Sequence, residues 1–139
     1  MDHLAKYPDF KKFLDQSGKR VDLMTKGEVI QFYALIKNVQ SLSNTDIECL
    51  VSICNEGPLY DGDVLSKTSR DNLLRLNFVT KVVVKSIDGM NGCTSLGFKA
   101  LSLISDGVLN CVIPDIETLT KAAFVGFLNH QEHIHHHPV

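Results

Sequence analysis

Basic side chains are concentrated in one short stretch of this chain, between Ser66 and Lys85. The 139-residue sequence carries a formal net charge of −2, so no overall positive field would draw it to a polyanion. Within the stretch, however, Asp71 is the single acidic residue. Clustered guanidinium and ammonium groups bind phosphate oxygens, although a solvated helix face with ordinary surface lysines explains the same pattern. The basic residues are Lys67, Arg70, Arg75, Lys81 and Lys85.

The spacing of the four cysteines does not suit a metal site. Zinc sites typically contain two cysteines separated by two to four residues, and no such pair occurs here. Cys49 and Cys54 are five positions apart, which places them on different faces of a helix. We therefore expect Cys49, Cys54, Cys93 and Cys111 to be reduced and mostly buried as small hydrophobic side chains.

Five of the six histidines lie in the C-terminal segment His130–Val139. Imidazoles so close together bind Ni²⁺, Cu²⁺ or Zn²⁺ adventitiously, but a tail offers nothing to fix their orientation. The sequence also lacks a glycine-rich phosphate loop, an H-E-x-x-H motif and a G-x-S-x-G motif. Turn formation or helix capping explains Asp61 and Asp63. We expect no catalysis, no cofactor and no resident metal.

Helix signals dominate the first half of the chain. Pro8 begins a short helix that Gly18 ends. Thr25 and Glu28 form a capping-box pattern before a helix that runs to about Gln40.

Asn44 or Thr45 caps another helix, which closes at Gly57-Pro58. A short helical turn is expected between Asp61 and Lys67, and a further helix from Ser69 to Asn77. Its leucines should pack inward. The residues left more exposed should be Arg70, Asp71, Asn72 and Arg75.

A hairpin and two more helices are expected in the second half. Phe78–Lys85 is rich in β-branched residues and predicts a strand, and Asp88-Gly89 and Asn91-Gly92 are strong turn signals. The returning strand can then only be short, around Cys93. The remaining expected elements are a helix from Thr94 to Ile104, a short strand within Val108–Ile113 and a helix from Pro114-Asp115 to about Asn129.

Three segments resemble the MarR and PadR groups of winged helix-turn-helix regulators. Glu56-Gly57-Pro58-Leu59 is similar to the connector after the first core helix of such domains. Leu76–Val82 resembles their passage from recognition helix to wing, and Thr94–Leu101 resembles the start of the helix after the wing. The resemblance covers about 60 of the 139 residues. Asn77 replaces the usual Gly, and only 18 residues separate Leu59 from Phe78, so the helix-turn-helix is compressed.

The resemblance implies that the helix after Ser69 approaches DNA bases and phosphates, and that the hairpin tip around Met90 and Asn91 forms the wing contact. The implied DNA-binding residues are Lys67, Thr68, Ser69, Arg70, Asn72, Arg75, Lys85 and Asn91. The apolar face of the last helix could pair with a second copy, or could pack on the chain's own helix around Val29–Ile36. The predicted dimerisation residues are Ile116, Leu119, Ala123, Phe124 and Phe127.

The expected fold is mainly α with a small β-hairpin, a winged-helix core with additional N- and C-terminal helices. We expect one domain over residues 1–139. Its parts are N-terminal helices in 1–43, the winged-helix core in 44–105, a C-terminal helix in 106–129 and a flexible tail in 130–139. No apolar run approaches the roughly 20 residues of a membrane span, and no secretory signal is visible, so a cytoplasmic protein is expected.

Two functions fit this expectation. The first is a small, dimeric transcriptional regulator of bacterial or mobile-element type that binds duplex DNA. The second is a winged-helix module that binds protein, the compressed recognition region having lost DNA contact. A continuous positive surface joining Arg70, Arg75 and Lys85 would favour the first.

Overall fold

The structure is a computed structural model that describes residues 2–84 and 87–123. It is mainly helical with one small antiparallel sheet, which confirms the predicted fold class. The chain divides into two compact units. Unit 1 comprises Met1–Lys37 with Asp106–Val139, and unit 2 comprises Asn38–Ser105. Among the described helices, none is long and apolar enough to cross a membrane.

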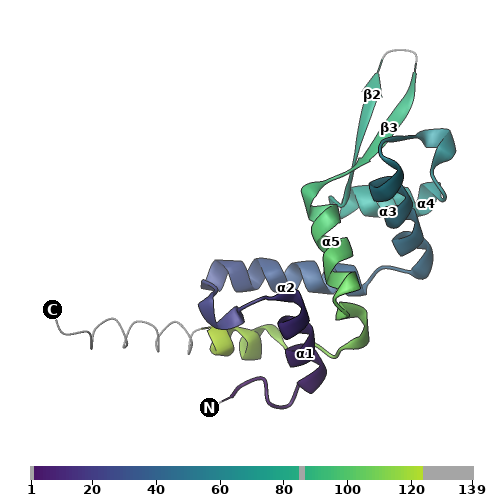
Figure 1. The fold of residues 1–139 in the computed structure, drawn as a ribbon. Coiled ribbons are helices and arrows are strands. Elements are labelled where there is room, and N and C mark those ends of the chain that lie inside the picture. The colour runs from purple at the N-terminus through teal and green to yellow at the C-terminus, as the bar shows by residue number, and fades with distance from the viewer. Residues whose placement is uncertain (1, 85–86, 124–139) are drawn as a thin grey trace. The chain divides into compact units, whose positions relative to one another are not determined.

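Unit 1 is built from helices around a pair of phenylalanines. Its elements are α1 (Pro8–Ser17), the 3₁₀ helix η1 (Val21–Leu23), α2 (Lys26–Gln40) up to Lys37, the 3₁₀ helix η3 (Val108–Asn110) and a helical segment over 116–123 (Figure 1). Phe10 and Phe13 are buried on α1, with ring centroids 5.9 Å apart. The strand predicted within Val108–Ile113 is wrong, because the chain forms the tight turn of η3 there.

Local signals set the ends of these helices. Pro8 stands in the first turn of α1, and Gly18 ends it in the left-handed conformation with φ 69°, as predicted. The capping box predicted before α2 is confirmed. The Glu28 backbone N–H donates to Thr25 Oγ1 at 3.2 Å, and the Thr25 backbone N–H donates to Glu28 Oε1 at 3.1 Å.

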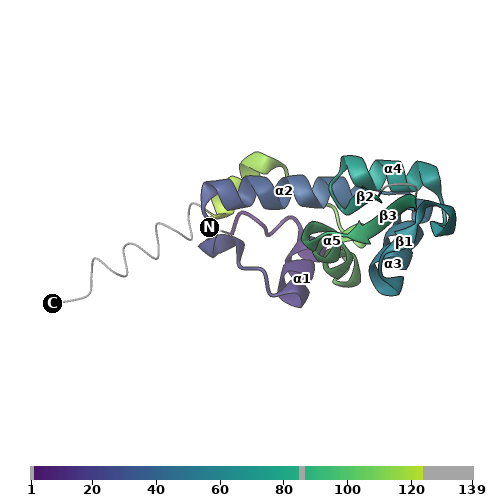
Figure 2. The same cartoon turned by 90° about the horizontal axis from the view of Figure 1, so that it is seen from above.

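Unit 2 contains three helices and the sheet (Figure 1). In chain order its elements are α3 (Asn44–Glu56), β1 (Leu59–Tyr60), the 3₁₀ helix η2 (Asp61–Asp63), α4 (Lys67–Arg75), β2 (Val79–Val84), β3 (Ile87–Cys93) and α5 (Ser95–Ser105). The strands are antiparallel in the order β1-β3-β2. In both views the sheet lies beside α3 and α4 (Figure 2).

The two core helices of unit 2 begin earlier than predicted. Ser43 caps α3 in a capping box with Asp46, so neither Asn44 nor Thr45 is the cap. Ser66 caps α4 by accepting from the Ser69 backbone N–H at 3.1 Å, so α4 begins at Lys67 instead of after Ser69. In both cases the cap is the serine three residues before the N–H that it satisfies.

The chain passes directly from α4 into β2. Asn77 ends the helix in the left-handed conformation with φ 63°, which asparagine tolerates better than most residues. Phe78 is completely buried immediately after it. The hairpin therefore starts at the end of α4, as the sequence predicts.

The returning strand of the hairpin is longer than predicted. Asp88-Gly89 and Asn91-Gly92 both lie within β3, which pairs with β2 from Val79↔Cys93 to Val84↔Ile87. Neither dipeptide is the hairpin turn, and hydrogen bonds of Asn91 with Leu59, Asp61 and Arg70 hold that residue within the strand.

A disulfide joins α3 to the end of β3. Cys54 and Cys93 are bonded, with Cα atoms 4.9 Å apart across a sequence separation of 39. The expectation that all four cysteines are reduced is therefore wrong for this pair, because the fold of unit 2 brings together residues that are distant in sequence. Cys49 and Cys111 form no disulfide and are buried, as expected.

Candidate interaction surface of unit 2

The eight residues predicted to contact DNA differ in their exposure. Lys67, Thr68 and Arg75 are exposed on α4, and Asn72 is half-buried. Ser69, Arg70 and Asn91 are buried, and Lys85 lies outside the described residues. The structure therefore does not bring the eight together on one surface.

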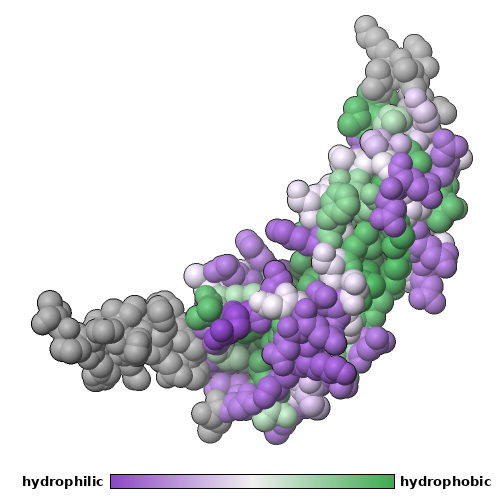
Figure 3. Space-filling model, viewed as in Figure 1, coloured by the Kyte–Doolittle hydropathy of each residue, from purple (hydrophilic) through white to green (hydrophobic). Residues whose placement is uncertain are grey.

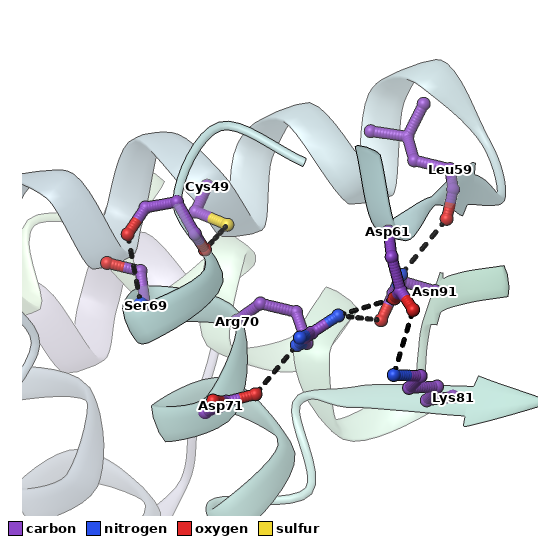
Figure 4. A network of polar contacts seen from close by, with 9 residues as sticks. Cys49, Leu59, Asp61, Ser69, Arg70, Asp71, Lys81 and Asn91 are labelled. Carbon is purple, nitrogen blue, oxygen red and sulfur yellow. Dashed lines mark hydrogen bonds and ion pairs between the residues drawn. The ribbon is translucent and has the colours of Figure 1, made fainter. Parts of the chain in front are cut away.

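The prediction that Arg70 is exposed is wrong. Its relative exposure is 6%, and its guanidinium points toward Asp61 and Asn91 (Figure 4). Nη1 donates to Asp61 Oδ1 at 2.6 Å, and Nε donates to Asp71 Oδ1 at 2.8 Å. Arg70 stands three residues before buried Leu73 on the same face of α4, a spacing that could have indicated its inward position.

Asn91 is the second correction. Predicted at the hairpin tip, it lies in the middle of β3 with a relative exposure of 0%. Its Oδ1 accepts from Arg70 Nη1 at 3.2 Å. Its Nδ2 donates to the Leu59 carbonyl at 3.1 Å and to Asp61 Oδ1 at 2.9 Å. Asn91 thus ties together β1, η2 and α4 instead of reaching outward (Figure 4).

Asp61 connects the same network to β2. Lys81 Nζ lies 2.9 Å from Asp61 Oδ2. Hydrogen bonds from Asn91 and Lys81, together with one from Arg70, hold the pKa of the Asp61 carboxyl well below its usual range. The sequence analysis assigned Asp61 only a capping or turn role, and no local pattern shows that two basic residues converge on it.

A second polar cluster fastens α4 to α3. Asn72 Nδ2 donates to Asp46 Oδ2 at 3.1 Å, and Arg75 Nη2 donates to Asn72 Oδ1 at 2.7 Å. Burial opposes ionisation of Asp46, but hydrogen bonds from Ser69, Ser43 and Asn72 outweigh it and lower the pKa of its carboxyl. Ser69 and Asn72 therefore serve contacts within unit 2.

The hairpin carries exposed apolar side chains that the sequence analysis assigned only to a strand. Val82 is 56% exposed and Val83 is 73% exposed. The hairpin extends beyond the helices of unit 2 (Figure 1), and hydrophobic residues gather on it beside its tip (Figure 3). Val82 and Val83 are consecutive in β2 and so lie on opposite faces of the sheet. We call these two residues the hairpin valines.

The residues predicted to form a dimer are only partly described. Leu119 and Ala123 are buried, and Ile116 is half-buried, in the helical segment over 116–123. Leu119 and Ala123 therefore offer no surface to a second copy, which corrects their assignment as contact residues. Phe124 and Phe127 lie outside the described residues.

Unit 1 has a shallow cavity lined by charged side chains, among them Asp2, Lys11, Arg20 and Asp22. These four already pair with one another: Lys11 Nζ lies 2.6 Å from Asp2 Oδ2, and Arg20 Nη2 lies 2.6 Å from Asp22 Oδ2. Across residues 2–84 and 87–123, no three His, Cys, Asp or Glu side chains are placed to hold a metal ion. The hairpin is thus the stronger candidate surface.

Comparison of the chain with protein-family models, curated protein sequences and solved structures finds no match.

Proposed function

We propose that unit 2 is a winged-helix module that binds another protein through its hairpin. The element order supports this proposal, because a helix, a short strand, α4, a two-stranded hairpin and a closing helix follow one another as in winged-helix domains. The compressed segment before α4 contains only the single turn η2. The proposed role is binding, with no catalytic step.

The burial of Arg70 is the observation that carries the choice of protein over DNA. A guanidinium held by Asp61 and Asp71 has no free edge for a phosphate or a base. Lys81 is likewise paired with Asp61. Unit 2 as a whole carries six basic and seven acidic side chains, a net charge of −1. A positive surface through Arg70, as DNA binding would use, is therefore not supported.

The hairpin valines supply what a protein partner would bind. Each valine exposes apolar surface on its own face of the hairpin, and a partner that covers either face removes that surface from water. A projecting hairpin also lets a partner approach from both faces of the sheet.

Binding to duplex DNA is the second candidate, because Lys67, Thr68 and Arg75 remain exposed along α4. Such residues contact backbone phosphates and would give weak, salt-sensitive affinity. In this reading the chain is a homodimeric transcriptional regulator.

Fluorescence anisotropy of a mixed-sequence duplex of about 20 base pairs, titrated with the full chain at low salt, tests the DNA candidate. We expect no saturable binding. Salt-sensitive binding that is lost in the double variant Lys67→Ala/Arg75→Ala would overturn the proposal in favour of DNA.

Selection of random displayed peptides on the full chain tests the protein-binding role. We expect enriched peptides whose affinity falls by about tenfold or more in Val83→Lys, because the lysine places a charge in the apolar contact. The matched control is Val112→Lys, which alters a valine of unit 1 that is 76% exposed. Peptides that bind Val83→Lys as well as the unaltered chain would contradict the proposal.

The disulfide bears on the compartment in which the module acts. Bonds such as Cys54–Cys93 persist in oxidising compartments and are uncommon in the reducing cytoplasm of most cells. The bond therefore favours an oxidising compartment over the cytoplasm expected from the sequence. Acid quenching of cells, followed by alkylation with a polyethylene-glycol maleimide, would report how many thiols of the chain are free. Four reactive thiols in the denatured chain would restore the cytoplasmic assignment.

A further inference from the structure

Strand β2 forms an open edge of the sheet. In the order β1-β3-β2, the strand β3 is central and β2 pairs with it along one side. Along the other side, no strand of the described chain pairs with β2. The opposite edge, β1, has only two residues, Leu59 and Tyr60, whereas β2 has six. An edge of this length presents backbone N–H and C=O groups that another strand can bind.

The features that usually protect an edge strand are missing from β2. Val79–Val84 contains no proline, and its one charged residue, Lys81, is bound to Asp61. The pairing between β2 and β3 shifts between Val82↔Met90 and Val84↔Ile87. The additional residue lies on β3, so the irregularity does not interrupt the outer edge of β2.

The charge pattern of β2 suits pairing with a copy of itself. In an antiparallel pair centred on Val82, each Val82 faces the other, Lys81 faces Val83, and Thr80 faces Val84. No like charges then stand opposite each other, and β-branched side chains meet across the strands. A pair centred on Lys81 would instead set two ammonium groups face to face, which disfavours that register.

We propose that β2 pairs antiparallel with β2 of a second copy, centred on Val82, so that two hairpins form one continuous sheet. A two-fold contact of this kind is closed, because each copy uses up its own open edge. Each hairpin valine then gains a cross-strand neighbour on its own face of the sheet. This inference rests on the proposed function and names a second copy of this chain as the partner.

Sedimentation velocity of the full chain over a concentration series tests the pairing. We expect a monomer–dimer equilibrium that Val82→Lys weakens by about tenfold or more, since two lysines would face each other. Val112→Lys, at the exposed valine of unit 1, should leave the equilibrium unchanged. Because Val82 is more than half exposed, we expect Val82→Lys to fold. Circular dichroism of each variant checks this expectation.

Mixing two variants gives the sharper test. Because position 82 faces itself, Val82→Lys and Val82→Glu should each be mainly monomeric alone and should form a dimer when mixed. This rescue should weaken with added salt, since it depends on exposed opposite charges. A dimer formed through any other surface would show no such dependence on the mixture.

Three results would overturn the inference. These are a monomer in the unaltered chain at concentrations up to about 1 mM, a dimer that Val82→Lys does not weaken, or a mixture that fails to restore association. The first result needs no variant. If selected peptides still bind the hairpin of a monomeric chain, the second copy is excluded and the protein-binding role stands. If the duplex binds instead, the proposed function itself fails.

Discussion

Gly89 on β3 lies against the side chain of Lys81 on β2, so that a Cβ atom at position 89 would clash with Lys81 Cε. The same Cβ would stand 3.0 Å from Asp61 Oδ2. Because residue 89 has no side chain, Lys81 can cross the sheet and reach Asp61. The glycine thus helps to neutralise the one charge of β2, a role that its Asp-Gly context does not indicate.

Gly89→Ala should therefore displace the Lys81 side chain and break its ion pair with Asp61. We expect the free energy of unfolding, measured by urea denaturation, to fall by about 0.5–1 kcal/mol, because the flexible end of Lys81 can move aside and only a partly exposed ion pair is lost. Gly92→Ala is the matched control, because it lies in the same strand and its added Cβ would have no atom within 4 Å. Equal losses in the two variants would contradict the role given to Gly89.

The features that the sequence predicted correctly are those decided within a few residues. Thr25 and Glu28 form their capping box through bonds across three positions, and Gly18 ends α1 by its own backbone conformation. The β-branched run after Asn77 likewise gave the first strand of the hairpin, because strand preference is a property of the run itself.

The features that it predicted wrongly depend on distant residues. Asn91-Gly92 is a strong turn signal, yet Asn91 is held in β3 by the Leu59 carbonyl, 32 positions away. Cys54 and Cys93 meet only because β3 packs against α3. The charge of Arg70 favoured a surface position, and Asp61, the partner that compensates its burial, lies nine residues away in the sequence. The candidate surface was missed for the same reason, since sheet order determines which strand is at the edge.

Arg70 and Arg75 should differ sharply when each is replaced by alanine. Arg70→Ala removes the buried guanidinium from Asp61 and leaves Asn91 Oδ1 without its donor, and should lower the free energy of unfolding by about 2–4 kcal/mol. Arg75→Ala removes an exposed side chain bonded to Asn72 and should change it by about 0.5 kcal/mol or less. Thermal or urea denaturation distinguishes the two. Similar small effects would mean that Arg70 is not bound as described.

The lowered pKa of Asp61 should make stability depend on pH. A carboxyl whose pKa is lower in the folded than in the unfolded state stabilises the fold fully above its unfolded pKa, and this stabilisation is lost as the pH falls. We expect the difference in urea midpoint between the unaltered chain and Asp61→Asn to be constant near neutral pH. It should shrink as the pH falls below about 4. Asp63→Asn, which alters an exposed carboxylate of the same 3₁₀ helix, is the control for the loss of one charge. A difference that does not change with pH would show that Asp61 gains nothing from its partners in the fold.

Reduction of the Cys54–Cys93 bond should destabilise unit 2 without altering its fold. The bond closes a loop across 39 positions, and removing such a constraint from the unfolded chain typically costs about 2–4 kcal/mol. We expect a phosphine reductant to lower the urea midpoint of the unaltered chain. The double variant Cys54→Ser/Cys93→Ser should have the lower midpoint with or without reductant, because the remaining cysteines, Cys49 and Cys111, are buried and form no disulfide. A midpoint that reductant leaves unchanged in the unaltered chain, with both thiols shown to be reduced by alkylation, would mean that the bond adds no stability. The hairpin would then depend for its position on the network of Asp61, Arg70 and Asn91 alone.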